Sequence, residues 1–348
     1  MTTTYKLATD QDDAELRALL RDNAMPSWVT MTVSREPSFF AGANRFGRDW
    51  AVIARQDASP VGMYACSEQS VHLNGAPCEL GYLGALRLNP SHRNRLRILR
   101  DGFASVRTFS PPRSRQLWYT AIASENLVAR RILEANIRSM PRYRAINELV
   151  TLALPRARGR RRSMWRQVQP GEMGRLCSFY NQHACQYQFS PALTVELAVA
   201  TGASFFVVAE QGEFHACMAL WNQQNYKQVV ACAYRRPLGT LLPVYNAYAR
   251  LTSKIPLPRV GQALDLTHLA FLAVAPPLDQ EIVALIEDAL AINPTAVLTL
   301  GLHTSHPWLA SLVRTYRPTS YRTWIYAVNF DDSVSLDGRP AQPEVAVL

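Results

Sequence analysis

The sequence lacks most of the features that would place a protein in a class at once. Its 348 residues contain six cysteines and no Cys-x-x-Cys pair, which argues against a disulfide scaffold and favours buried thiols in a reducing compartment. No apolar run is long enough to cross a bilayer, and no apolar leader follows the first residues. There is also no Walker loop, no Gly-x-Gly-x-x-Gly and no Ser-His-Asp spacing. We therefore expect a cytoplasmic protein with no membrane partner.

Acidic residues are also in short supply. The chain has 27 Asp and Glu against 37 Lys and Arg, for a net charge of +10. Such a balance favours an anionic partner: a phosphorylated cofactor, an acidic substrate or nucleic acid. With 48% hydrophobic residues, the chain can bury substantial cores, and its length suits two domains.

The first half of the chain alternates between strand and helix patterns. We expect strands over 50–55, 61–66, 71–73, 79–88, 117–122 and 145–154, and helices over 91–109 and 125–135. Thr9 and Asp12 form a capping-box pattern ahead of Leu16, Leu19 and Leu20, which recur at helical spacing. The basic stretch 156–163 then interrupts the pattern.

The element order starts again after this stretch. A shift of 160 residues places Leu176, Phe179 and Tyr180 on the leucines of the first helix. Strands over 204–210, 215–221, 264–274, 296–302 and 321–329 follow, with helices over 238–251, 280–292 and 307–315. The repeat predicts a duplicated fold. The predicted divisions are a first domain over 1–155, a linker over 156–163, a second domain over 164–330 and a flexible tail over 331–348.

The most informative stretch is 86–99, which reads as a strand end, a Pro-containing turn and an arginine-rich helix start. Its basic residues are Arg87, His92, Arg93, Arg95 and Arg97, and Arg100 follows. Free N–H groups at a helix start, surrounded by cations, suit a pyrophosphate. The alternative is an ordinary amphipathic helix with an arginine-rich solvent face.

The first half resembles the GCN5-related N-acetyltransferase (GNAT) family. The resemblance rests on Leu88-Asn-Pro90 followed by Arg93, and on Asn126-x-x-Ala129 in the next strand–helix unit. It implies an α+β (mixed α/β) fold of two tandem GNAT-like domains, each a mixed, mostly antiparallel sheet flanked by helices. It also implies acetyl-CoA, or another acyl-CoA, as co-substrate. By position, the pantetheine contacts would be Leu86 and Leu88, the phosphate contacts Arg93, Asn94, Arg95, Leu96, Arg97 and Ile98, and Asn126 would approach the cofactor arm.

Two departures from the family pattern leave an alternative open. Leu96 and Ile98 stand where the family has glycine or alanine, and glycine lets a backbone come close to a phosphate. Leu133 stands where many members have a tyrosine that protonates the departing thiolate. The resemblance therefore implies either an N-acetyltransferase or a non-catalytic GNAT-like binding or regulatory protein with a degenerate cofactor site.

An acyl transfer to an amine by direct attack needs a base, because only the neutral amine attacks. Glu79, near the start of the cofactor strand, is our candidate, with Tyr82 following on the same strand. Glu79 is equally compatible with a solvent-facing strand position. The acceptor would be the amine of a small molecule or a peptide.

The second half departs further, since its turn over 274–279 has no arginine or glycine and contains Asp279. We expect this copy not to bind CoA, and instead to line the acceptor pocket or to complete a cleft between the two domains. His268, His303 and His306 have no metal-type spacing, so we predict hydrogen-bonded core histidines and no metal. Nucleic acid is a disfavoured partner, because no aromatic residues alternate with the arginines of 93–100 or 156–162.

Overall fold

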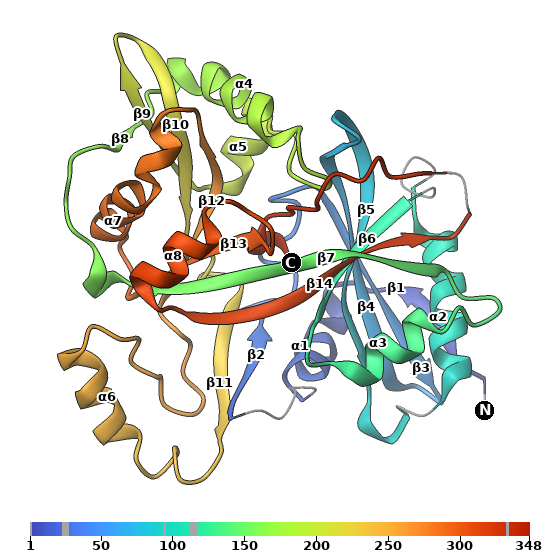
Figure 1. Ribbon diagram of the computed structural model, residues 1–348. Helices are drawn as coiled ribbons and strands as arrows, with labels where there is room; N and C mark the ends of the chain where they lie inside the picture. The colour runs from blue at the N-terminus through green and yellow to red at the C-terminus, as the bar shows by residue number, and fades with distance from the viewer. Residues whose placement is uncertain (1, 23–27, 93–94, 112–116, 332–333) are drawn as a thin grey trace.

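The computed structural model describes residues 2–22, 28–92, 95–111, 117–331 and 334–348 (Figure 1). The strands of the first half are β1 (Thr4–Leu7), β2 (Val29–Ser34), β3 (Arg48–Gln56), β4 (Ser59–Leu73), β5 (Ala76–Leu88), β6 (Leu117–Ala123) and β7 (Arg142–Pro155). Its helices are α1 (Asp13–Arg21), α2 (Leu96–Phe109) and α3 (Leu127–Glu134). The predicted elements of this half are thus present, with β4 running on through 71–73.

The second half repeats this order. Its strands are β8 (Arg166–Gln167), β9 (Ser204–Glu210), β10 (Glu213–Trp221), β11 (Gln228–Tyr234), β12 (Leu266–Val274), β13 (Val297–His303) and β14 (Thr319–Asn329). Its helices are α4 (Met173–Ala184), α5 (Val195–Thr201), α6 (Leu242–Leu251), α7 (Ile282–Ile292) and α8 (Leu309–Tyr316). The strands β2 and β11, which the sequence patterns did not reveal, pair with each other in a separate two-stranded sheet.

The two halves build one sheet rather than two. Its twelve strands lie in the order β1-β3-β4-β5-β6-β14-β7-β13-β12-β10-β9-β8. The last strand of each half is exchanged: β14 pairs with β6 of the first half, and β7 pairs with β13 of the second. The long β7 and β14 pair with each other and cross the middle of the molecule (Figure 1). The mixed α/β class and its mostly antiparallel sheet are as predicted.

Helices cover both faces of the sheet in the same way in each half. In the first half, Leu16, Leu19 and Leu20 of α1 pack against Ile53 and Met63 on one face. The opposite face carries α2 and α3, with Phe103 and Leu133 against Trp118. The predicted capping box is present, since the Thr9 N–H donates to Asp12 Oδ2 at 2.9 Å.

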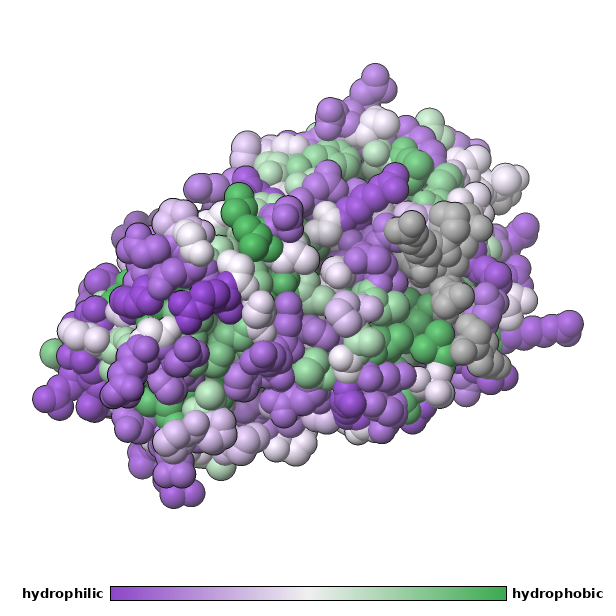
Figure 2. Space-filling model, turned by 90° about the horizontal axis from the view of Figure 1, so that it is seen from above, coloured by the Kyte–Doolittle hydropathy of each residue, from purple (hydrophilic) through white to green (hydrophobic). Residues whose placement is uncertain are grey.

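In the second half, α4 and α5 cover one face and α7 and α8 the other. Leu176 and Tyr180 of α4 pack on Cys217 and Phe271, while Leu285 and Leu312 pack on the other side. The expected alignment of α4 with α1 therefore holds in space. Seen from above, the molecule is elongated, with scattered apolar patches on a largely hydrophilic surface (Figure 2).

The basic stretch between the halves is packed rather than freely solvated. Asp288 of α7 accepts the main-chain N–H groups of Arg162, Met164 and Trp165 at 2.7, 2.7 and 3.0 Å. A Cβ on Gly159 would lie 2.5 Å from the Ala291 nitrogen, so this glycine permits close approach to α7. Carboxylates on a neighbouring helix thus hold a segment that the sequence presents only as polar and charged.

The tail prediction is wrong for the residues that the structure describes after position 333. Ala341 and Ala346 are buried, and Asn147 of β7 bonds the main chain of Ala341 in both directions, at 2.7 and 3.1 Å. Ala341 packs in a core cluster with residues of β4 to β7, and Ala346 packs in a core cluster of the second half.

Candidate functional site

The strands β5 and β6 are paired over two residues only and then separate near the centre of the sheet. We call this opening the first fork. The two strands pair in parallel only at Gly81–Trp118 and Tyr82–Tyr119. Beyond this point β5 carries a bulge, because its register with β4 shifts between Met63 and Ala65, and Ala85 has a left-handed φ of +49°. A bulge turns main-chain groups out of the ladder. The predicted cofactor strand thus has a bulge directly before Leu86 and Leu88.

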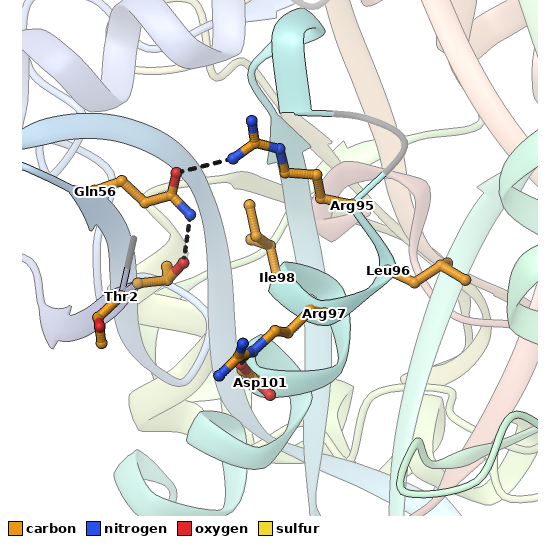
Figure 3. A pocket seen from close by; sticks show the side chains of 8 residues that line it. Thr2, Gln56, Arg95, Leu96, Arg97, Ile98 and Asp101 are labelled. Carbon is orange, nitrogen blue, oxygen red and sulfur yellow. Dashed lines mark hydrogen bonds and ion pairs between the residues drawn. The ribbon is translucent and has the colours of Figure 1, made fainter.

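The turn after β5 leads into the start of α2, where the cations gather. The Arg95 N-cap makes no side-chain hydrogen bond to its helix, and the first turn of α2 lines a cavity of about 360 Å³. Arg95 donates to Gln56 Oε1 at 3.2 Å, and Arg97 lies 3.6 Å from Asp101 (Figure 3). A helix start with two arginines at a cavity is suited to an anion. Arg93 and Asn94, also predicted here, lie outside the described residues.

The two bulky residues at the predicted glycine positions point in different directions. Leu96 is 47% exposed and directed away from Arg97 and Asp101 (Figure 3). Ile98 is buried and packs with Ala54 and Val61 beneath the helix. Ile98 therefore anchors α2 to the sheet, and both bulky residues line the cavity.

The other predicted cofactor contacts occupy the same end of the sheet. Leu86 is 39% exposed beside the bulge, while Leu88 packs against the Ile98 cluster. Asn126 caps α3, where its Oδ1 accepts the Ala129 N–H at 3.2 Å. Leu133 is buried in the core under α3, so the described structure places no acid group at that position.

The two predicted catalytic residues both lie on β5 before the bulge, three residues apart. Glu79 is exposed and lies six residues before Ala85, about 20 Å along a strand. Tyr82 is buried three residues before the bulge, with its ring 5.0 Å from that of Tyr119. Burial raises the pKa of Tyr82 despite the nearby Arg35 and Arg87, so its phenol stays protonated at neutral pH.

The second half contains an equivalent fork. Here β12 and β13 pair in parallel from Leu266–Val297 to His268–Thr299. The register of β12 with β10 then shifts, and Phe271 has a φ of +53°. The bulge follows the last parallel pair by three residues in both copies, so Phe271 corresponds to Ala85 and His268 to Tyr82.

The chain's own last residues fill this second fork. Glu344 Oε1 accepts the Phe271 N–H at 2.7 Å. Gln342 accepts the His303 N–H at 2.8 Å and donates to Gly301 O at 2.6 Å. A Cβ on Gly301 would lie 2.1 Å from Val345, so the tail packs directly on β13.

Comparisons with solved structures identify this doubled arrangement. The chain aligns with the Saccharomyces cerevisiae N-myristoyltransferase with bound myristoyl-CoA at a TM-score of 0.61 and 10% identity, over 97% of this chain and 88% of that one. It aligns with a GCN5-related N-acetyltransferase from Anabaena variabilis at a TM-score of 0.52 and 8% identity, over 94% and 72%. The chain has a tandem GNAT fold. No protein-family model and no curated protein sequence matches it.

The tandem GNAT fold brings together a row of polar side chains that the sequence patterns did not reveal. Tyr82 of the first fork interacts electrostatically with Arg35, which in turn interacts with Lys227. Lys227 interacts with His268 of the second fork, whose Nδ1 lies 2.7 Å from Thr299 Oγ1. The charges of Arg35 and Lys227 therefore act on groups of both forks.

Lys227 is the most perturbed cation of this row. Burial, with a contribution from Arg35, lowers the pKa of Lys227 to about 7. Its Nζ donates to the main-chain oxygens of Ala346 and Leu348 at 3.1 and 2.8 Å. One signal in the sequence could have drawn attention to Lys227. Only three of the 37 lysines and arginines are lysines, and Lys227 is one of them.

The remaining histidines of the second half form an aromatic cluster. The rings of His303 and His306 lie 5.1 Å apart, and His306 contacts Trp308 at 4.5 Å. Burial lowers the pKa of both histidines. Across the described ranges, no three His, Cys, Asp or Glu side chains are placed to hold a metal ion, and no helix of those ranges is long and apolar enough to cross a membrane.

Proposed function

We propose that this chain transfers an acyl group from an acyl-CoA to the amine of a small molecule or a peptide. The fold supports this proposal, because its aligned structures include an N-acetyltransferase and an N-myristoyltransferase bound to myristoyl-CoA. The observation that carries it within this chain is the first fork, whose bulge at Ala85 leads directly into the uncapped, arginine-flanked start of α2.

The two halves would have different roles, because the described tail residues occupy the second fork and not the first. The tail residues Gln342 and Glu344 hold the second fork, which would exclude a cofactor arm there. The first fork would receive the pantetheine arm along Leu86 and Leu88, with the pyrophosphate at Arg95 and Arg97. The row from Tyr82 to His268 would then lie on the acceptor side.

The reaction would proceed by direct attack. The neutral amine nitrogen forms a bond to the thioester carbon, the carbon–sulfur bond breaks, and the CoA thiolate leaves with a proton. Main-chain N–H groups at the bulge would stabilise the oxyanion. Neither Glu79, distant from the bulge, nor protonated Tyr82 suits a base, whereas a neutral Lys227 would keep a lone pair after its two donated hydrogen bonds.

Calorimetric titration with acetyl-CoA and with longer acyl-CoAs tests the proposal. Arg95→Ala should weaken acyl-CoA binding about tenfold to a hundredfold, because it removes a charge-assisted bond to phosphate. Arg314→Ala, an exposed arginine of α8, is the matched control and should bind as the wild type does. Absence of binding by every acyl-CoA would overturn the proposal.

The competing function is a GNAT-like protein that binds acyl-CoA without catalysis, and the bulky Leu96 and Ile98 that line the cavity favour it. An assay for free CoA thiol over a panel of amines and short peptides separates the two. Release of thiol that depends on an amine supports the transferase, while tight acyl-CoA binding with no release over the panel supports the binding protein.

A further inference from the structure

A segment of the second half has no counterpart among the described residues of the first half and stands apart from both forks. It runs from the end of β11 to the start of β12 and contains α6, which projects at the lower left of Figure 1. Residues 235–264 of this segment contain five lysines and arginines and no aspartate or glutamate. This charge asymmetry selects for an anionic partner.

The outward face of α6 is apolar. Leu241, Val244, Tyr248 and Leu251 recur at helical spacing and are exposed, Val244 by 66% and Leu251 by 87%. The inner side of the helix packs on the rest of the protein. Ala249 is buried there, and the Asn246 side chain makes two hydrogen bonds with the main chain of Leu257, at 2.8 and 2.9 Å. The apolar face is therefore not the packing face of α6.

One cation borders this apolar face directly, since Lys254 Nζ lies 5.2 Å from the centre of the Tyr248 ring, and other cations lie on the inner side of α6. A cavity of about 420 Å³ lies between α6 and the segment after β7, and Arg156, Arg250 and Lys254 line it over a floor that includes Ala249 and Pro256. Arg158 ties the two walls together by donating to Thr252 O at 3.4 Å. Three cations beside apolar residues are suited to a ligand that has both a phosphate group and an apolar part, such as a phospholipid.

A tryptophan marks the base of the same segment. Trp28 is 60% exposed, and the guanidinium of Arg235 lies 5.0 Å from its ring. The Arg235 N–H donates to Trp28 O at 3.1 Å, where β2 meets the end of β11. Exposed Trp and Tyr beside arginine are typical of the membrane–water interface.

We propose that the α6 surface, formed by Leu241, Val244, Tyr248, Leu251, Arg250 and Lys254, docks on an anionic lipid membrane. A membrane surface offers both a place to bury aliphatic side chains and phosphates for the bordering cations. A second copy of the chain would oppose cations to cations. A polynucleotide would leave the leucines and the valine in water. A contact at the membrane surface needs no membrane-spanning helix. The proposal therefore differs from the sequence analysis only in the expectation that the protein has no membrane partner.

Vesicle co-sedimentation tests this docking with the full chain. Wild-type protein should sediment with vesicles of phosphatidylcholine mixed with phosphatidylglycerol, much less with phosphatidylcholine alone, and less at high salt. Arg250→Ala with Lys254→Ala should lower the partition coefficient roughly 30-fold, as two surface cations predict. Val244→Ser with Leu251→Ser should lower it about tenfold.

Matched controls keep the result interpretable. Val313→Ser and Arg314→Ala change exposed residues of α8 and should sediment like the wild type. All variants change exposed side chains, and circular dichroism melts establish that they fold. Acyl-CoA affinity should stay unchanged, so this test is independent of the transferase proposal.

Three results would overturn the proposal. The first is failure to sediment with the anionic vesicles at low salt. The second is sedimentation that the apolar double variant leaves unchanged, which would mark charge attraction alone. The third is a concentration-dependent dimer in light scattering that the Val244→Ser, Leu251→Ser variant abolishes, which would assign the face to a second copy.

Discussion

At the scale of single residues, Lys227 gives the sharpest expectation for activity. With a pKa of about 7, its amine accepts a proton only above neutrality, so kcat/KM should rise with pH through about 7 if Lys227 is the base. Lys227→Met should lower kcat/KM by about a hundredfold and remove this rise, with the pH–rate profile as the measurement. Lys254→Met is the control.

A second residue, Glu344, makes stability depend on pH. Burial raises the pKa of Glu344 to about 7, although the Phe271 N–H bond opposes the shift. Between its ordinary pKa and 7 the folded state binds more protons than the unfolded state, so the free energy of unfolding should fall as pH rises through this window. Glu344→Gln should lose this dependence, as urea midpoints at about pH 5 and about pH 8 would show.

The control for this measurement is Glu281→Gln, which removes an exposed carboxylate and should keep the wild-type pH dependence. A wild-type midpoint that does not move between the two pH values would contradict the assignment to Glu344.

Residue-scale prediction from sequence succeeded where the chemistry is local. The Thr9–Asp12 capping box and the buried leucines of α1 depend on spacing within one helix. Lys227 could not be found this way, because its environment comes from Arg35, His268 and the chain's last residues. Those segments are distant in sequence and meet only in the fold.

At the scale of elements, the connection between the halves depends on one carboxylate. Asp288 is fully buried and accepts the Arg162, Met164 and Trp165 N–H groups and the Arg161 guanidinium. Burial alone would raise the pKa of Asp288, but these hydrogen bonds outweigh it and lower the pKa. The stabilisation is therefore present above the ordinary Asp pKa and is lost as pH falls.

Asp288→Ala should lower the free energy of unfolding by about 3–5 kcal/mol, because it leaves several main-chain N–H groups without their acceptor. The neighbouring Glu287→Gln, which weakens the more exposed pair with Arg162, should cost under about 1 kcal/mol. Urea denaturation of both variants measures the contrast, and equal losses would contradict this account of the connection.

Element prediction reached most strands and helices, but not the partners of the strands. Alternating apolar residues predicted β6, β7, β13 and β14 separately. Nothing in their patterns indicates that β14 lies between β6 and β7, since all four strands are apolar and each would fit several neighbours. The bulges at Ala85 and Phe271 are equally hidden, because neither position has the glycine that marks such a conformation.

At the scale of the whole molecule, the exchange of β7 and β14 makes each half depend on the other. Without β14, β6 would lose its antiparallel neighbour, and without β7, β13 would lose its own. A pair of domains joined by a solvated linker would unfold in two steps, whereas a shared sheet should unfold in one.

We therefore expect urea unfolding to be a single transition. Hydrogen exchange followed by mass spectrometry should report the same midpoint for β4 of the first half and β10 of the second, because both belong to one sheet. Separate fragments 1–158 and 159–348 should each lack a cooperative transition, since each exposes the edge left by the missing strand. Mixing them should restore it. Two distinct midpoints in the intact chain, or a fragment that folds alone, would show that the exchanged strands do not couple the halves.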